Sequence, residues 1–167
     1  MFGDVFFNEK NYPTCTMREA SLLISDGPFG SNLKSEHYVS EGVRVIRLQN
    51  IGEGEFLDED KAFISAEHFN ELKKYTCRPG EIVIGTLGTP NFRAAIIPDY
   101  VPISINKSDC VHYIPNPDLL DSIFACAMFN SHSMLLQAEN VAHGETRKRI
   151  AMGQVAQLRI ILPQMRD

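Results

Sequence analysis

Long apolar runs are missing from this sequence. The longest apolar stretches fall far short of the roughly 20 residues that span a bilayer. The N-terminal string MFGDVFFNEK carries acidic groups early and has no small-residue cleavage pattern, so it does not have the features of a secretory signal peptide. We therefore expect a cytoplasmic protein that has no membrane partner.

Cysteine pairs with metal-binding or redox spacing are also absent. The four cysteines are Cys15, Cys77, Cys110 and Cys126, and no two of them stand at C-x-x-C spacing. No histidine follows a cysteine at a zinc-finger distance. This pattern favours free thiols, mostly buried, in a reducing cytoplasm. We expect neither a bound metal nor a cofactor.

Catalytic signatures are lacking as well. The five histidines are scattered without H-E-x-x-H spacing, and the chain has no G-x-S-x-G elbow, no Walker motif and no methyltransferase motif. Cys110 and His112 stand two apart in a predicted strand and share a face, so a Cys–His nucleophile is one interpretation. A packed thiol beside a surface histidine is the more common arrangement. We therefore expect a protein without catalytic activity of its own.

Length and charge limit the remaining possibilities. The chain has 167 residues, of which 44% are apolar, and a net charge of −5. One domain of this size buries roughly 70% of its unfolded surface and folds without a metal or a disulfide. The acids gather in 53–60, whereas bases gather at Arg44, Arg47 and 147–149. The net charge argues against simple electrostatic DNA binding, but the segregation permits a basic face on an acidic molecule.

Three segments have the signals of helices. Apolar residues recur at helical intervals in 16–24, which predicts a short helix capped by Thr16. Ser65 has the chemistry of an N-cap before a second helix. The longest helix is expected over 118–140, where an apolar stripe follows a proline.

Alternating and β-branched residues predict the strands. Segment 43–49 alternates imperfectly, as a strand does when both of its faces are buried. Segments 81–87 and 93–98 flank a Gly- and Pro-containing turn and predict a hairpin. Further strands are expected at 101–105, 109–114 and 158–163. The fold class is therefore α+β, a single domain with a mainly antiparallel or mixed, strongly twisted sheet and a few helices.

The string DGPFGSNLK at 26–34 is a dense backbone constraint. Gly27 and Gly30 can adopt backbone angles that a side chain forbids, and Pro28 fixes one angle and removes a donor. The expected result is a stiff turn with free N–H groups beside polar side chains, which suits an anionic surface. Turns of this composition also serve simply to reverse the chain, and local chemistry leaves that alternative open.

Cations and carboxamides recur in the other predicted turns. In DNA-binding proteins phosphate contacts position the protein, while arginine reads guanine and asparagine or glutamine reads adenine through paired hydrogen bonds. The candidates for such contacts are Ser31, Asn32, Lys34, Arg47, Gln49, Asn50, Thr89, Asn91, Arg93, Lys107, Thr146, Arg147, Lys148 and Arg149. Structural alternatives stay open for them: a hydrogen-bonded strand end, an ordinary hairpin turn, a surface lysine and a solvated helix start.

Several strings resemble, in order, the target recognition domain of type I restriction–modification specificity subunits, also called DNA methylase specificity domains. DGPFGSNLK resembles the opening of that domain, EGVRVIRLQNIGEGEF its G-x-P-V-I-R-x-x-N-I strand and loop, and RPGEIVIGTLGT its x-x-G-D-I-L-I-x-x-x-G hairpin. PDLLDSIFACAMFNS resembles its long helix, HGETRKRI its G-x-T-R-x-x-I loop and LRIILPQ its terminal strand. Two departures are Glu81 in place of the usual aspartate and Val43-Arg44 in place of the expected proline.

This resemblance implies recognition of one half-site in double-stranded DNA as the specificity component of such a system. Partner methyltransferase subunits, and through them the restriction subunit, would carry out methylation and cleavage. The chain would be one target recognition domain over 1–167, in which MFGD and Tyr12-Pro13 mark 1–13 as the remnant of the junction after a spacer helix. The alternative is a protein-interaction module that docks the methyltransferase subunit and reads little DNA.

Overall fold

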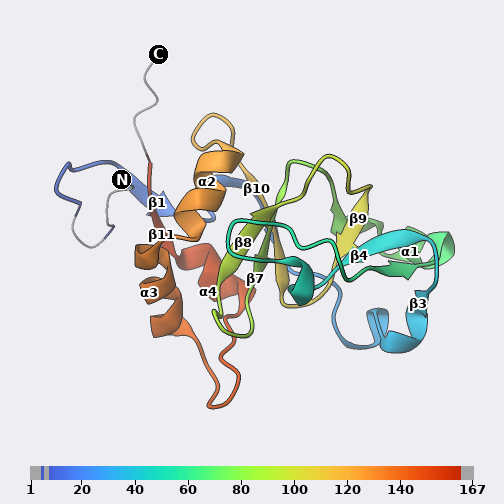
Figure 1. Ribbon diagram of the computed structural model, residues 1–167. Coiled ribbons are helices and arrows are strands. Elements are labelled where there is room, and N and C mark those ends of the chain that lie inside the picture. The colour runs from blue at the N-terminus through green and yellow to red at the C-terminus, as the bar shows by residue number, and fades with distance from the viewer. Residues whose placement is uncertain (1–4, 6–7, 163–167) are drawn as a thin grey trace.

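The computed structural model describes residue 5 and residues 8–162 of the chain (Figure 1). Its strands are β1 Thr14–Thr16, β2 Ser21–Ser25, β3 Tyr38–Val39, β4 Val43–Ile46, β5 Ala62–Ile64, β6 Thr76–Cys77, β7 Ile82–Gly85, β8 Arg93–Ile96, β9 Ser104–Asn106, β10 Cys110–Pro115 and β11 Arg159–Ile161. Its helices are α1 Ala66–Glu71, α2 Ser122–Phe129, α3 His132–Val141 and α4 Met152–Gln157. Short 3₁₀ turns occupy Gly30–Asn32, Ser35–His37, Leu48–Asn50 and Lys73–Tyr75.

The strands fall into three sheets. A four-stranded sheet has the order β2-β10-β7-β8 and is antiparallel throughout. A five-stranded sheet has the order β3-β5-β4-β9-β6, in which only β4 and β9 run parallel. Strands β1 and β11 pair separately near the two ends of the described chain. The expected α+β class with mainly antiparallel and mixed strands is confirmed.

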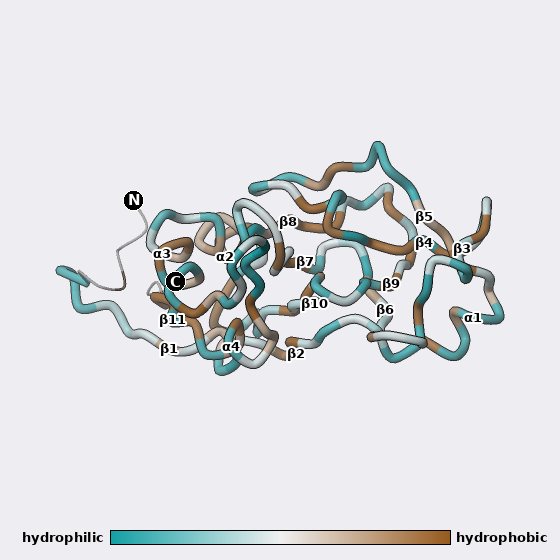
Figure 2. The backbone as a smooth tube through the Cα atoms, turned by 90° about the horizontal axis from the view of Figure 1, so that it is seen from below, coloured by the Kyte–Doolittle hydropathy of each residue, from teal (hydrophilic) through white to brown (hydrophobic). Residues whose placement is uncertain are grey.

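The four-stranded sheet lies between helices α2, α3 and α4 and the five-stranded sheet (Figure 2). Alternate residues of β7 face opposite ways: Ile82 and Ile84 belong to the core that includes Phe129 of α2, whereas Val83 belongs to the core that includes Ile46 of β4. Burying each such side chain contributes about 1.5–3 kcal/mol. The central sheet is therefore covered on both faces, and the loops at its ends are held on a rigid support.

The predicted helix over 16–24 is wrong. Thr16 does cap one turn, since its Oγ1 accepts a hydrogen bond from the Glu19 N–H at 3.2 Å and Glu19 Oε2 accepts one from the Thr16 N–H at 2.7 Å. The chain then extends as the edge strand β2, which pairs with β10. Apolar residues are buried at helical intervals here because a turn and a strand face the same core. The pairing of β2 with β10 therefore overrides the helical pattern of the sequence.

The single helix predicted over 118–140 is two helices. Ser131 begins α3 as its N-cap and accepts a hydrogen bond from the Met134 N–H at 3.3 Å. Asn130 ends α2, and its side chain makes two hydrogen bonds to the backbone of Ala94 in β8. It accepts one from the N–H at 3.0 Å and donates one to the carbonyl at 2.9 Å. This corner fastens the helices to the sheet. The short helix α4 was not predicted.

The other predicted elements are present, most of them with shorter bounds; the strand expected at 101–105 is found at Ser104–Asn106 and the one expected at 109–114 at Cys110–Pro115, so both are shifted toward the C-terminus. The strand expected over 43–49 is β4, which is buried on both faces and gives way to a 3₁₀ turn at Leu48–Asn50. The hairpin is β7–β8, and Ser65 caps α1 by accepting from the His68 N–H at 3.1 Å. The later strands are β9, β10 and β11. Within the described residues, no helix is both long and apolar enough to cross a membrane.

Candidate nucleic-acid interface

Loops from distant parts of the sequence meet on one side of the molecule, the lower edge of Figure 1 and the side seen in Figure 2. We call this surface the loop face; it consists of 26–34, 47–50, 86–92, 107–109 and 143–149. Backbone hydrogen bonds join its members. The N–H of Thr86 donates to the carbonyl of Asp109 at 2.9 Å, and the N–H of Ile150 donates to the carbonyl of Thr86 at 3.0 Å.

The glycine-rich turn is attached to this face by close backbone packing. A Cβ at Gly27 would lie 2.3 Å from the carbonyl carbon of Lys107 and 2.5 Å from the carbonyl oxygen of Asn106, so only glycine fits. Gly30 has a φ of 55°, in the left-handed region. Pro28 is buried. Glycine is required at position 27 because there is no space for a Cβ, and it is favoured at position 30 because of the positive φ. The two constraints together make the turn rigid.

A polar hollow of about 200 Å³ lies at the centre of the loop face. We call it the cationic hollow; its lining residues are Arg47, Leu48, Gln49, Lys107, Ser108 and Asp109. The Arg47 guanidinium and the Lys107 ammonium both lie 5.6 Å from the centroid of the Tyr38 ring. Each such contact contributes about 0.5–1 kcal/mol at an exposed site. Tyr38 therefore contacts two cations that come from different loops, and both line the same hollow.

Besides Asp109, which lines the hollow, a second carboxylate, Asp60, orients two of its residues. Asp60 Oδ1 accepts a hydrogen bond from Arg47 Nη2 at 2.6 Å, and its Oδ2 accepts one from Gln49 Nε2 at 2.8 Å. The Asp60 side chain is 55% exposed, whereas that of Arg47 is 19% exposed. A phosphate that binds Arg47 therefore has to displace Asp60. Among the described residues, Lys107 has no carboxylate partner.

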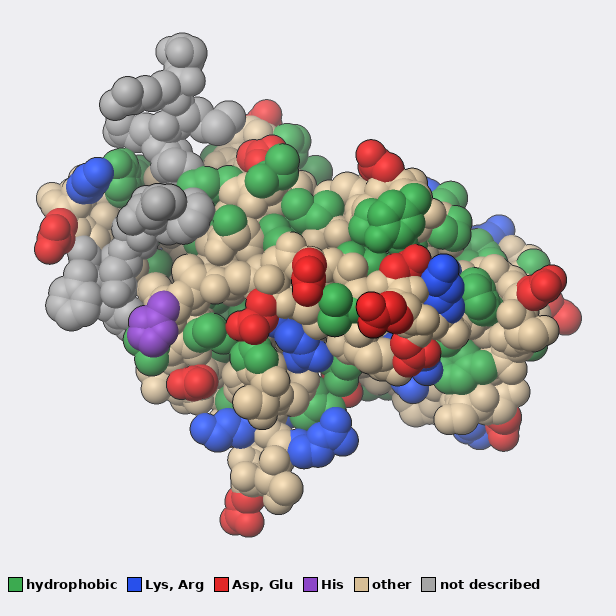
Figure 3. All heavy atoms as spheres, viewed as in Figure 1, with side chains coloured by type: hydrophobic (Ala, Val, Ile, Leu, Met, Phe, Trp, Pro, Cys, Tyr) green, Lys and Arg blue, Asp and Glu red, His purple; other side chains and the backbone are tan. Residues whose placement is uncertain are grey.

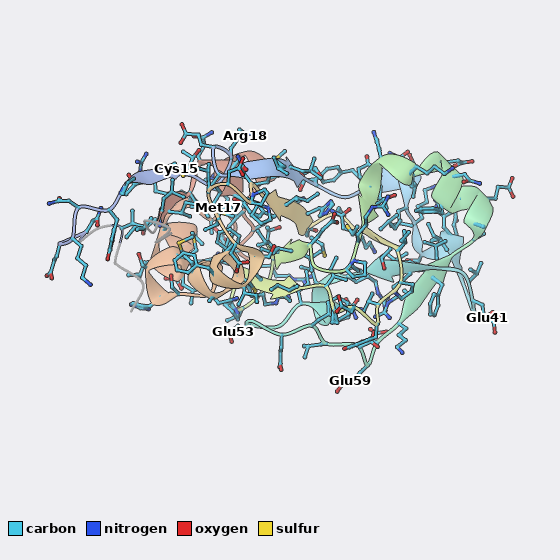
Figure 4. The ribbon with its side chains drawn as sticks, turned by 90° about the horizontal axis from the view of Figure 1, so that it is seen from above. Cys15, Met17, Arg18, Glu41, Glu53 and Glu59 are labelled. Carbon is cyan, nitrogen blue, oxygen red and sulfur yellow. The ribbon has the colours of Figure 1, made fainter. Side chains whose placement is uncertain are left out.

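Most of the acidic run lies away from the loop face. Figure 4 shows Glu53 and Glu59 projecting from one long flank, opposite the flank that carries Cys15 and Arg18. The same run appears in Figure 3 as red groups on the front of the molecule. Part of the negative charge of the chain is therefore carried on this flank.

The loop 143–149 protrudes from the loop face and carries three of its six lysine and arginine side chains. Thr146, Arg147 and Lys148 are exposed. Figure 3 shows Lys and Arg side chains on both sides of the base of this protrusion. Arg149 is held more firmly, because its Nε lies 2.6 Å from Asp109 Oδ1. The loop thus offers free cations beside one that is anchored.

Two of the predicted contact residues bind the protein itself. Arg93 donates to four backbone carbonyls at 2.6 to 3.0 Å, those of Leu48, Ile51, Leu87 and Pro90. Asn50 is fully buried; it accepts from the Arg47 N–H at 2.9 Å and donates to the carbonyls of Leu57 and Asp60 at 2.9 and 2.7 Å. Four of the five N–H donors of Arg93 and both amide N–H donors of Asn50 are used on backbone carbonyls, so these two residues position loops.

The remaining candidates divide by exposure. Thr89 is exposed at the tip of the β7–β8 hairpin, whereas Asn91 is 5% exposed and lies beneath it. Ser31, Asn32 and Lys34 are exposed on the 3₁₀ turns toward α1. His68 of α1 fixes this stretch, because its Nε2 lies 2.8 Å from the Asn32 carbonyl oxygen. The structure therefore brings most candidates to one surface and removes Asn91 from it.

Cys110 and His112 do share a face of β10, but they lie inside the protein. Burial raises the pKa of the Cys110 thiol to about 12, so it is protonated at neutral pH. His112 is 2% exposed, and its Nε2 lies 2.7 Å from Glu81 Oε2. Burial lowers the pKa of His112, although Glu81 acts in the opposite direction. The arrangement is that of a packed thiol and a buried histidine hydrogen-bonded to Glu81, and neither is an accessible nucleophile.

Sequence reasoning missed two aromatic residues of this surface. Tyr38 supports both cations of the hollow, and Phe29 is 46% exposed within the turn that the sequence singled out. No local signal identifies Tyr38, because its role depends on Arg47 and Lys107 arriving from elsewhere. Phe29 belongs to the DGPFGSNLK motif at 26–34, but the sequence alone did not indicate that its side chain is exposed.

Solved structures with this fold come from type I restriction–modification systems. A first structure comes from work on the complex assembly and conformational transition of the type I R-M system. It matches with a TM-score of 0.64 and 16% sequence identity, and the match covers 92% of this chain and 34% of that chain. The S subunit of such a system from M. genitalium has a TM-score of 0.55 and 18% identity, over 96% and 37%. The HsdS subunit from Thermoanaerobacter tengcongensis has a TM-score of 0.60 and 14% identity, over 91% and 33%.

These likenesses confirm the fold that the sequence motifs implied. The chain spans about a third of the length of the chains that it matches. No protein-family model and no curated protein matches the sequence. At these identities the likeness concerns the fold, and the function has to be argued from the surface.

Proposed function

We propose that this chain recognises one short half-site in double-stranded DNA as the specificity component of a type I restriction–modification system. It would correspond to a target recognition domain over 1–167, with 1–13 as a junction segment that lies partly outside the described residues. It would do no chemistry itself. Methyltransferase subunits and, through them, the restriction subunit would act on the DNA that it selects, in the cytoplasm.

The observation that carries this proposal is the convergence of the loops. Five separate segments that contain cations, carboxamides and hydroxyls converge on one face (Figure 2), while Glu53 and Glu59 of the acidic run project from the flank (Figure 4). DNA recognition needs both kinds of group together, because phosphate contacts set the register and base contacts choose the sequence. The fold shared with type I S subunits supports the same conclusion.

The geometry suggests a division of roles. Lys107, Arg147 and Lys148 suit phosphate contacts, since they are cations without a carboxylate partner among the described residues. Gln49 suits a base edge, because Asp60 orients its carboxamide at the rim of the cationic hollow. Arg47 suits either partner once phosphate displaces Asp60. Arg93 and Asn50 would act by holding the loops in place.

A randomised duplex library tests the proposal, with the chain assembled with its cognate methyltransferase subunit. We expect enrichment of one short motif, and we expect Lys107→Ala to weaken retention of all sequences. Lys10→Ala is the matched control, because Lys10 is an exposed lysine on the N-terminal segment, away from the loop face. If the assembled complex enriches no motif, the proposal is wrong.

A second candidate function is docking of the methyltransferase subunit with little DNA readout. An apolar groove of about 410 Å³ favours it, together with Leu22 and Ile123, which are 65% and 73% exposed. Exposed apolar surface of this kind is typical of protein contacts. The groove lies beside β2 and the start of α2, so docking there leaves the loop face free. Such docking is compatible with DNA recognition.

A further inference from the structure

Phe29 is an exposed aromatic residue on the loop face. Its side chain can make neither a hydrogen bond to a base nor a contact with phosphate charge, so the roles proposed above do not account for it. Its side chain is 46% exposed. Scattered exposed apolar residues are normal on protein surfaces and by themselves imply nothing. Three features of its setting distinguish Phe29: a rigid support, a cationic neighbour and its place in one segment of the loop face.

The support is rigid on both sides of the ring. Gly27 packs against the backbone of Lys107 with no room for a side chain, and Pro28 is buried. On the other side, the N–H of Asn32 donates to the Phe29 carbonyl at 3.2 Å. The ring therefore stays outside the protein core because the backbone holds it there. Little conformational entropy remains to be lost when the ring meets a ligand.

The neighbours of the ring are charged. The Arg149 guanidinium lies 6.0 Å from the ring centroid, and the same Arg149 is anchored on Asp109, which lines the cationic hollow. Lys107, whose backbone touches Gly27, lines that hollow as well. An exposed apolar ring beside an anchored arginine, with a lysine on the adjoining segment, matches a duplex, in which phosphates lie on either side of the stacked bases.

We propose that Phe29 is an apolar wedge that inserts at a base step of the bound duplex and opens or kinks it. This inference rests on the proposed function and goes beyond it, because it assigns part of the specificity to deformation of the DNA. Proteins that insert apolar side chains unstack a step and bend the helix. Pyrimidine–purine steps deform most easily, so the recognised half-site should place such a step opposite Phe29.

The test uses the chain assembled with its methyltransferase subunit and a selected duplex that carries 2-aminopurine at successive positions. We expect a rise in fluorescence at one step with the wild type, and none with Phe29→Ala. Affinity should fall about tenfold in Phe29→Ala, in line with loss of one stacked ring. Phe29→Leu should retain most of the signal, because a wedge needs an apolar group more than an aromatic one.

Three controls separate the possible explanations. Tyr100→Ala removes a more exposed aromatic ring, 69% exposed, from the loop between β8 and β9 at the opposite edge of Figure 1, and should change nothing. The salt dependence of binding should stay the same in Phe29→Ala, since no phosphate contact is lost. Replacing the deformable step by a stiff A-tract should weaken the wild type and spare Phe29→Ala.

The outcomes are distinct. Sequence-specific binding with equal fluorescence in wild type and Phe29→Ala would overturn the wedge and leave the proposed function standing. A Phe29→Ala variant that loses affinity for the methyltransferase subunit, with DNA deformation unchanged, would assign the ring to a protein contact instead. Absence of any enriched motif would remove both proposals.

Discussion

Single side chains decide how the loops of this protein are held. Arg93 was predicted as a DNA contact because it follows a hairpin turn, yet its guanidinium serves four carbonyls of the 47–51 segment and of its own hairpin. Hydrogen bonds from a charged donor contribute about 1.5–3 kcal/mol each, and buried carbonyls are costly to leave without a donor. A cation in a turn can thus belong to the scaffold.

Replacing Arg93 by lysine should show whether stability depends on the positive charge of Arg93 or on its four hydrogen bonds to carbonyls. Lysine keeps the positive charge but cannot reach four carbonyls, so we expect the free energy of unfolding to fall by about 3 kcal/mol. Urea denaturation of Arg93→Lys measures this. Arg147→Lys is the matched control, because Arg147 is exposed. A stable Arg93→Lys protein would show that the carbonyl contacts matter little.

Asp26 should make stability depend on pH. Burial raises the pKa of this carboxyl group, Arg149 lowers it and Asp109 raises it further. The folded-state pKa therefore lies above the unfolded value, and the wild type loses stability as the pH rises from about 4 through the folded pKa. Asparagine carries no charge to bury.

Asp26→Asn should consequently be more stable than the wild type at about pH 7, and the difference should vanish below about pH 4. Urea titrations at both pH values provide the measurement. A difference that is equal at both would mean that the effect of Asp26→Asn does not come from ionisation.

At the scale of elements, the loop face depends on close approach between backbones. The 26–34 turn rests on 106–107, and the corner between α2 and α3 is fastened to β8 by Asn130. Neither contact follows from the propensity of its own segment. The break at Ser131 interrupts an apolar stripe that the sequence presents as continuous, because capping and the bond to the sheet are stronger than helix continuation.

Gly27→Ala should displace the turn. Its Cβ would overlap the Lys107 carbonyl, and overpacking of this kind costs about 1–3 kcal/mol. We expect a lower melting temperature and weaker DNA binding. Gly153→Ala is the contrasting control: nothing lies within 4 Å of its added Cβ in α4, so the same change should stabilise by about 0.5–1 kcal/mol. Equal effects at both glycines would show that the turn is not closely packed.

At the scale of the whole molecule, the distribution of charge matters more than its sum. The net charge is −5, yet the loop face presents Lys107, Arg147 and Lys148 without carboxylate partners among the described residues. Long-range repulsion from the flank should lower affinity, while local contacts remain sensitive to salt.

Salt titration of DNA binding should count the phosphate contacts. Each cation that neutralises one phosphate contributes about 0.9 to the slope of log K against log salt. We expect Lys107→Ala and the double change Arg147→Ala with Lys148→Ala to lower the slope by about one and two units. Lys10→Ala should leave it unchanged. Binding that ignores salt would favour docking through apolar surface.

Sequence analysis predicted the local features well. The β7–β8 hairpin, the Ser65 cap and the buried β4 strand depend on residues within a few positions of each other, so their patterns were sufficient. The helix at 16–24 failed because its burial pattern has two sources, a turn and an edge strand. The two helices in 118–140 were merged because only the bond from Asn130 to β8 explains why the chain turns there.

The sequence alone determined the α+β class, the turn that must contain glycine and the supply of cations and carboxamides in loops. Only the tertiary structure decided which of them share a surface. Tyr38 contacts both Arg47 and Lys107. Arg93 donates hydrogen bonds to the carbonyls of Leu48 and Ile51, which are far from it along the chain. Such partners meet through strand pairing over long sequence separations, and that pairing depends on the packing of the whole core, which no local pattern records.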